Sequence, residues 1–270
     1  MKIIGWIVFR IFDHRSKTRS VKAIFTILTL FICLALPDTA TSQDPAEIIQ
    51  KSIDLINGES SEATTRMTIV RPKYTRDIEM KTWSYGNDYF LVYITSPAQE
   101  KGQVFLKRET DMWNWIPKIS RMIKIPPSMM SQSWMGSDFT NDDLVKVNSL
   151  VVDYTHNLVG EENVGGYDCY KIELIPKPES PVVWGKVVIW IAKDEYFQMK
   201  SEYYDEDMEL VNTLEASEIR TFGDRKLPAK LVMTPVQKDG QQTIMYTKEQ
   251  AFDVGIDPSF FSQQNMKSVR

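Results

Sequence analysis

The chain has 270 residues, with 32 Lys and Arg against 36 Asp and Glu, and 43% of its residues are apolar. This is the composition of an ordinary globular protein. It excludes an intrinsically disordered chain and a membrane protein with many spans.

The first 42 residues have the pattern of a secretory signal. Six basic residues precede an apolar run of 14 residues, Ala23 to Leu36, which is too short to span a bilayer comfortably. Small residues stand where signal peptidase requires them, at Ala40 and Ser42, so we expect cleavage after Ser42. Two alternatives stay open: lipid attachment at Cys33, which lacks small residues before it, and retention of the segment as an uncleaved anchor.

Removal of residues 1–42 takes away six basic and two acidic residues, and the remaining chain has a net charge of −8. A charge of this sign argues against nucleic acid or an anionic bilayer as a charge-driven partner. His156 and Cys169 are then the only residues of their kinds. An intramolecular disulfide, a zinc site of several Cys or His, and CxxC redox chemistry are therefore excluded. We expect no metal and no cofactor.

A helix is predicted directly after the signal. Asp44 is placed as its N-cap, Pro45 suits the first helical position, and Glu47 is placed to close a capping box. Apolar residues then recur on one face before a stop signal, in the order Ile49, Ile53, Ile56 and Asn57-Gly58.

From Ser61 onward the pattern of apolar residues has a period of two, which is typical of strands. A first series of strands is predicted at about 61–71, 76–86, 88–96, 101–109 and 111–117. A second series is predicted at about 150–160, 167–176, 184–193, 197–204, 209–222, 226–236 and 241–250. No linker or repeat divides these series, so residues 43–270 are expected to form a single domain.

So many hairpin-spaced strands with one long helix cannot form a flat sheet without curling. We therefore expect a mainly β fold: a strongly curved antiparallel sheet or half-open β-barrel, with the N-terminal amphipathic helix and short helices as cover. Residues 89–94 are apolar on both faces of their strand. Either one face meets the helix and the other a cavity, or both faces pack in a thick core.

Residues 112–135 contain three of the seven Trp and five of the 13 Met. Met-rich surfaces adapt to apolar ligands of variable shape, and Trp supplies broad contact area. This composition favours the wall or lid of an apolar pocket, although packing without a ligand would explain it too. The candidate pocket or lid residues are Trp113, Trp115, Met122, Met129, Met130, Trp134, Met135 and Phe139.

The oxygen-rich stretch that follows, residues 136–144, has two interpretations. It faintly resembles a calcium loop, but it lacks the glycine and the glutamate of an EF-hand. The alternative is a short helix that starts at Asp142-Asp143, with Thr140 or Asn141 as its N-cap and acidic side chains near the positive end of the helix dipole. We favour the helix.

The residues that could support catalysis are few. His156 lies in a strand-like run, and the chain has no GxSxG nucleophile elbow. Cys169 has no sequence neighbour that would lower the pKa of its thiol, so we interpret it as a packing residue. Glu202 and the run 205–207 could form carboxylate pairs, but this run is typical of a solvated hairpin tip. We therefore expect a protein that is not an enzyme.

The stretch from Trp134 to Leu144, WMGSDFTNDDL, resembles the LolA-like outer-membrane lipoprotein-sorting family, in particular its uncharacterised branch. The likeness extends over most of residues 43–270. It includes the helix after Asp44 and three further segments in the same order, Gly166–Tyr170, Val188–Ile191 and Met199–Asp205.

The resemblance implies a half-open barrel whose lid covers an apolar cavity for the acyl chains of a lipoprotein or lipid. It implies a periplasmic carrier that moves this cargo toward the outer membrane, with an inner-membrane transporter and an outer-membrane acceptor as partners. An arginine is expected to hold the lid closed, and Arg108 and Arg121 are the candidates. We expect a monomer that does not bind nucleic acid. The alternatives are an envelope sensor or regulator of the same fold, or an accessory of a lipid exporter of the resistance-nodulation-division type.

Overall fold

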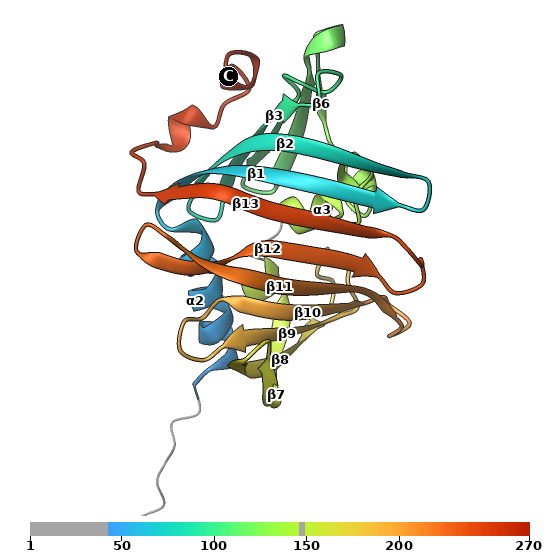
Figure 1. Ribbon diagram of the computed structural model, residues 1–270, viewed down its shortest axis with the longest axis vertical. Helices are drawn as coiled ribbons and strands as arrows, with labels where there is room; N and C mark the ends of the chain where they lie inside the picture. Colours follow the sequence, from blue (N-terminus) through green and yellow to red (C-terminus); the bar gives the residue numbers. More distant parts are fainter. Residues whose placement is uncertain (1–42, 146–148) are drawn as a thin grey trace, which may run out of the picture. The chain divides into compact units, whose positions relative to one another are not determined.

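The computed structural model describes residues 43–145 and 149–270, and the predicted signal in residues 1–42 lies outside them. The described chain forms an open, 13-stranded antiparallel sheet (Figure 1). The strand order is β6-β5-β4-β3-β2-β1-β13-β12-β11-β10-β9-β8-β7. All neighbours are consecutive in sequence except β1 and β13, which pair at the centre of the sheet. The predicted mainly β fold of the LolA type is confirmed.

The first series consists of β1 (Ser60–Arg71), β2 (Tyr74–Tyr85), β3 (Tyr89–Ser96), β4 (Val104–Arg108), β5 (Asp111–Ile116) and β6 (Arg121–Lys124). The second series consists of β7 (Tyr154–Val164), β8 (Tyr167–Pro176), β9 (Lys186–Ala192), β10 (Gln198–Tyr204), β11 (Leu210–Phe222), β12 (Arg225–Pro235) and β13 (Gln242–Phe252). A strand lies at or near each predicted place, because alternating apolar residues and local turns specify hairpins. The strand predicted at about 150–160 is displaced: residues 149–152 form a short helix, and β7 begins at Tyr154. Sequence reasoning missed β6, a four-residue edge strand that follows Ser120 in a left-handed conformation.

Helix α2 (Pro45–Asn57) forms as its caps predict. The Asp44 side chain accepts a hydrogen bond from the amide of Ala46, and Gly58 ends the helix with a positive φ of 60°. Glu47 does not close a capping box; its carboxylate pairs instead with Lys51 one turn later, at 2.8 Å. The helix buries its apolar face against β7 to β9, in a cluster with Ile172 and Ile189 at its centre.

Between the two edge strands, the described residues 125–145 and 149–153 have little regular structure. They contain two 3-10 turns, at Pro127–Met129 and Trp134–Gly136, and two short helices, α3 (Asn141–Val145) and α4 (Ser149–Val152). We call residues 127–145 the strap. Met130 and Trp134 of the strap are buried against β1 to β5, where the Trp134 and Phe105 rings meet edge to face at 5.4 Å.

The opposite face of β3 to β5 is covered by the C-terminal segment, residues 256–269. Phe261, Met266 and Val269 are buried against Leu91 and Tyr93 in this layer. Both faces of β3 are therefore packed, as in the thick-core interpretation. The other interpretation, in which one face of this strand meets the helix, is wrong because α2 lies against the second series of strands.

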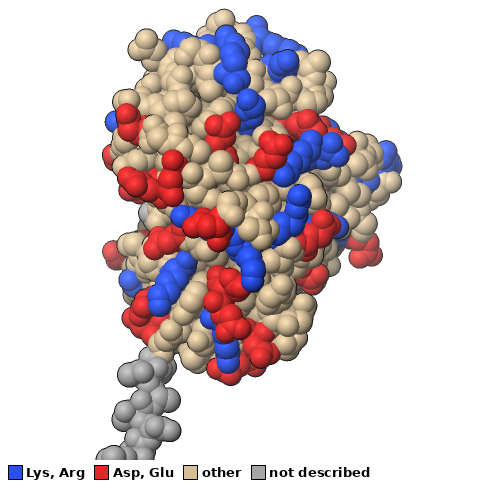
Figure 2. Space-filling view, turned by 60° about the vertical axis from the view of Figure 1, so that its left-hand side comes forward, with Lys and Arg blue, Asp and Glu red and all other residues tan. Residues whose placement is uncertain are grey.

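Charged side chains are mixed over the middle and lower part of the surface seen in Figure 2, where acidic and basic groups alternate. Some charged side chains form exposed ion pairs across neighbouring strands, such as Lys124 of β6 with Asp111 of β5 at 2.7 Å. Among the described residues, no helix is both long and apolar enough to cross a membrane.

Candidate functional site

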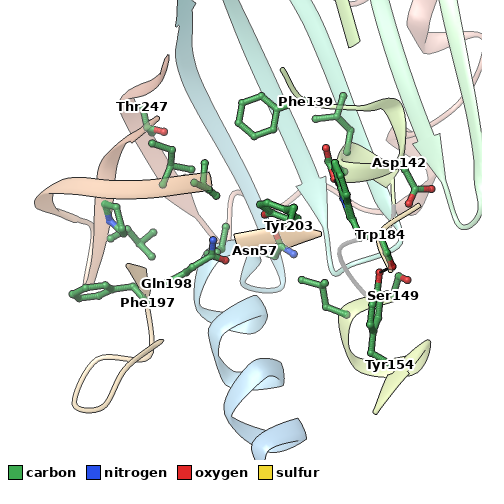
Figure 3. Close-up of a pocket in the computed structure, with 18 of the residues that line it drawn as sticks. Asn57, Phe139, Asp142, Ser149, Tyr154, Trp184, Phe197, Gln198, Tyr203 and Thr247 are labelled. Atoms are coloured by element: carbon green, nitrogen blue, oxygen red, sulfur yellow. Dashed lines mark hydrogen bonds between the residues drawn. The ribbon is translucent and has the colours of Figure 1, made fainter. Parts of the chain in front are cut away.

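A cavity of about 330 Å³ lies between the second series of strands, the end of α2 and the segment that holds α3 and α4. Figure 3 shows Trp184 and Tyr154 on one side of it, Phe197 and Gln198 on the other, and Asn57 at the end of α2 between them. The volume lies near the lower limit of pockets that bind small molecules.

The lining of the cavity is mostly apolar. Its apolar side chains come from α2, the segment that holds α3 and α4, the connections before β9 and before β10, and strands β11 and β12: Ile56, Phe139, Leu144, Leu150, Trp184, Phe197, Leu214, Leu227, Pro228 and Leu231. Its polar side chains are Asn57, Asp142, Asp143, Ser149, Tyr154, Gln198, Tyr203, Thr247 and Gln250. None of the lining residues is Lys, Arg or His, so this lining offers no cation to an anionic group.

Asp143 is fixed in the cavity wall by three hydrogen bonds. Its carboxylate accepts from the indole of Trp184 at 3.0 Å and from the amide of Thr140 at 2.7 Å, and its own amide donates to the Thr140 hydroxyl at 3.1 Å. The last two bonds form a capping box at the start of α3, which confirms the predicted helix start. Burial raises the pKa of the Asp143 carboxyl above its usual range, although these hydrogen bonds oppose the shift. The residue joins α3 to the connection before β9.

Two tyrosines, Tyr154 and Tyr203, are also among the polar residues of the wall. Burial raises the pKa of the Tyr154 and Tyr203 hydroxyls, and the nearby carboxylates add to this shift. Both hydroxyls therefore stay protonated at ordinary pH. The Tyr154 hydroxyl lies 3.4 Å from the carbonyl of Trp184, so it too holds the wall together.

The strap is fastened to the ends of two central strands. Arg71 of β1 donates to the Asp138 carboxylate at 3.0 Å and to the Gly136 carbonyl at 2.8 Å. Thr243 of β13 donates to the same carboxylate at 2.6 Å and accepts from the amide of Asp138 at 2.9 Å. Arg76 of β2 donates to the carbonyl of Met135. These contacts hold the strap across the sheet.

The structure places the eight predicted pocket or lid residues in three locations. Phe139 lines the cavity. Met130, Trp134 and Met135 pack under the strap against the first series of strands, where Met129 is exposed. Trp113, Trp115 and Met122 pack against the C-terminal segment on the opposite face. The structure thus brings Phe139 to the cavity and leaves the other seven outside it.

The predicted lid arginines do not hold the strap. Arg108 lies over the ring of Tyr89, at 5.9 Å from its centroid, and Arg121 is exposed at the start of β6. Arg71 and Arg76 take this position instead. They stand on the two strands of one hairpin, and the strap that they contact is more than 55 residues away in sequence. The only feature in the sequence that could have indicated their role is their position beside the turn of that hairpin.

The residues considered for catalysis have packing contacts. His156 lies in β7, with its Nε2 atom 2.6 Å from the carbonyl of Leu150. Cys169 is fully buried in an apolar cluster, as predicted, and burial raises the pKa of its thiol. Asp205 begins the turn between β10 and β11, as the hairpin interpretation predicts, and its carboxylate accepts from two amides of that turn.

Sequence reasoning missed the lining residues contributed by β10 to β12 and by Trp184. Those on β10 to β12 stand on strands whose alternation marks inward-facing positions, but the pattern does not distinguish a side chain in a packed core from one that borders a cavity. Trp184 lies in the connection before β9, where no periodic pattern applies. Ile56 continues the apolar face of α2 in the sequence. In the structure it is 41% exposed, because it borders the cavity.

Comparison with known proteins gives a consistent result. A model of a family described as an uncharacterized protein matches residues 86–268. No curated protein matches the chain. A DUF1329 family protein from Desulfovibrio piger has a similar structure, with 26% identity, a TM-score of 0.76, and coverage of 83% of this chain and 100% of that one.

Two further solved structures are similar over the same share of the chain. A putative outer membrane lipoprotein-sorting protein domain from Vibrio parahaemolyticus has 25% identity and a TM-score of 0.73, and 98% of it is covered. A LolA superfamily protein from Nitrosomonas europaea has 21% identity and a TM-score of 0.70, and 99% of it is covered. The last supports the fold alone.

Proposed function

We propose that this chain, which belongs to the family described as an uncharacterized protein and is similar in structure to the lipoprotein-sorting domain from Vibrio parahaemolyticus, is a carrier of acylated cargo. In this proposal it works in the periplasm without catalysing a reaction. It takes a lipid or lipoprotein from an inner-membrane transporter and passes it to an acceptor at the outer membrane.

The observation that carries the proposal is the apolar cavity beside α2 and the strap. A methylene group is close in volume to a water molecule, roughly 30 Å³. The cavity of about 330 Å³ therefore accommodates roughly 11 methylenes, which corresponds to most of one acyl chain. The absence of lining cations favours an aliphatic chain inside the cavity and leaves an anionic headgroup at its mouth.

The magnitude of the binding free energy suits a carrier. Burial of roughly 11 methylenes at ~0.8 kcal/mol each contributes ~9 kcal/mol before costs. Association and ordering offset a substantial part of this, about 4 kcal/mol or more. The net affinity for one chain is therefore moderate, which allows release to an acceptor. A cargo with several chains needs more space, and we propose that it obtains this space when the strap moves.

Strap movement would also give a role to the predicted residues outside the cavity. Met130 and Trp134 pack on the first series of strands while the strap is fastened. Their release would expose a second apolar surface continuous with Phe139 and Leu144, which belong to the strap and line the cavity. We propose that this surface receives the additional chains, in competition with the contacts of the closed strap.

The first test is native mass spectrometry of the protein purified gently from its own envelope, followed by lipid analysis of the denatured sample. A stoichiometric lipid or lipopeptide would support the proposal and would identify the class of cargo. A protein that is empty and also refuses added fatty acids and phospholipids would refute it.

A paired substitution tests the cavity itself. Leu231→Trp on β12 fills space in the cavity, and exclusion of about three methylenes at ~0.8 kcal/mol each weakens the binding of a fluorescent fatty acid roughly 50-fold. Val232→Trp, at the next position of the same strand, is the matched control because Val232 is not a lining residue. Equal binding by both variants would contradict the cavity assignment.

A further inference from the structure

The strongest feature outside the cavity is a group of unpaired cations at one end of the sheet. The connection between β3 and β4, residues 97–103, lies beside the turn between β5 and β6, residues 116–121. A Cβ atom placed on Gly102 would lie 3.3 Å from the Pro117 ring, so the two loops are in contact. We call these two loops, together with Lys267, the basic tip.

The basic tip carries four exposed cations: Lys101, Lys118, Arg121 and Lys267. Lys267 belongs to the tip because its Nζ atom lies 5.6 Å from the centroid of the Trp115 ring, one residue before the second loop. Within the described part of the chain, none of the four is in an ion pair with an acidic side chain. The one acidic residue of these loops, Glu100, pairs with Arg76 at 3.1 Å.

The tip is apolar at its centre. Ile119 stands between the cations of the second loop and is 57% exposed. Trp115 is half-buried close by, with its ring next to Lys267. The boundary between lipid headgroups and acyl chains favours this combination of side chains: an exposed aliphatic group, an amphipathic indole, and cations on long flexible side chains.

The sign of the charge here is opposite to that of the domain as a whole. Residues 43–270 have a net charge of −8. This net charge argues against an anionic bilayer as a partner only if the acidic and basic residues are distributed evenly over the surface. Figure 2 shows basic groups without acidic neighbours at the upper end of the molecule, the end at which β3 and β6 are labelled in Figure 1. Electrostatic attraction depends on this local charge, because screening limits its range to about 10 Å.

We infer that the basic tip docks on the surface of an anionic lipid bilayer. Ile119 enters the boundary of the acyl region, Trp115 lies at the level of the headgroups, and the four cations contact lipid phosphates. The remainder of the domain is net acidic, so orientations that bring it within about 10 Å of the lipids are disfavoured. The tip lies outside the cavity, and this inference therefore does not depend on the proposed cargo.

The test is sedimentation of residues 43–270, the unit that contains the whole sheet and all four apolar clusters, with vesicles. The vesicles contain phosphatidylcholine alone or with about 30% phosphatidylglycerol. We expect binding to the anionic vesicles at about 0.1 M salt, its loss at about 0.5 M salt, and no binding to the neutral vesicles. Equal binding to both kinds of vesicle would overturn the inference.

Substitutions locate the surface. Lys118→Gln is expected to weaken the partition about fivefold, since each cation near an anionic surface contributes about that factor. Lys118→Glu with Arg121→Glu is expected to abolish it. The matched control is Lys73→Glu with Lys238→Glu, the same change of charge in two exposed turns away from the tip.

The control pair must keep most of the binding, and loss of binding in both pairs would overturn the inference. A further variant, Ile119→Ser, keeps every charge, and it is expected to weaken binding while the salt dependence persists. Circular dichroism checks that each variant is folded. Binding of the fluorescent fatty acid is expected to be unchanged in all of them, which separates a failure of this inference from a failure of the cavity assignment.

Discussion

The fastening of the strap makes a sharp prediction for Asp138→Ala. The Asp138 and Arg71 side chains are only 6% and 12% exposed, and the Asp138 carboxylate also accepts from Thr243. Removal of one partner from a buried, hydrogen-bonded ion pair costs about 3–5 kcal/mol, because it leaves a charge without its partner. We expect a loss of this size in the free energy of unfolding, measured by urea denaturation.

A pair on the neighbouring surface gives the control. Arg66 and Glu79 are joined at 2.9 Å but are 46% and 34% exposed, so Arg66→Met should cost less than about 1 kcal/mol. Hydrogen exchange should also become faster in residues 134–140 of the Asp138→Ala variant and stay unchanged in β8 to β10. If Asp138→Ala costs no more than Arg66→Met, the strap is not fastened by this ion pair and the reasoning fails.

Three further predictions concern stability. Burial lowers the pKa of Lys107 from 10.5 to about 8. Below pH 8 the buried ammonium group therefore destabilises the folded state relative to the unfolded state by about 3 kcal/mol. This destabilisation is lost as the pH rises from 8 to 10.5, because the amine is then neutral in the folded protein. The stability of the native protein relative to Lys107→Met should rise over that window, and parallel curves from urea denaturation would contradict the assignment. Thr140→Ala removes the hydroxyl that accepts from the Asp143 amide in the capping box and should cost about 1 kcal/mol, whereas a neutral effect on thermal unfolding would show that this cap carries no stability. Phe261→Ala should cost about 3–5 kcal/mol because the side chain is fully buried, and a cost near zero would mean that the C-terminal segment is not docked.

The strands could be predicted from the sequence because every pairing but one is a local hairpin. Alternating residues and turns specify each hairpin within a window of about 20 residues. The expectation that the sheet and its helical cover enclose an apolar cavity came from the family resemblance. The short strand β6 could not be predicted in this way, because its four residues are mostly exposed and do not alternate. The pairing of β1 with β13 joins residues about 180 positions apart, and no local pattern specifies it.

The position of the cavity was harder to predict than the fold. The concentration of Trp and Met in residues 112–135 indicates apolar contacts, but it does not specify whether those contacts are with a ligand or with the protein itself. In the structure Trp134 packs on Phe105, and Trp113 packs near the C-terminal segment. The cavity forms where the strap leaves the first series of strands, at Phe139, and its other walls come from residues distant in sequence.

The central pairing of β1 with β13 also governs the order in which the chain can fold as it emerges N-terminus first during the proposed export. Strands β1 to β6 can form a meander of local hairpins as soon as they emerge, but the partner of β1 is the last strand of the chain. The hydrogen-bonding edge of β1 stays open until β13 has been made, and an open edge is a site for pairing with another chain. The first strand is therefore the edge most open to pairing with another chain until the last strand arrives.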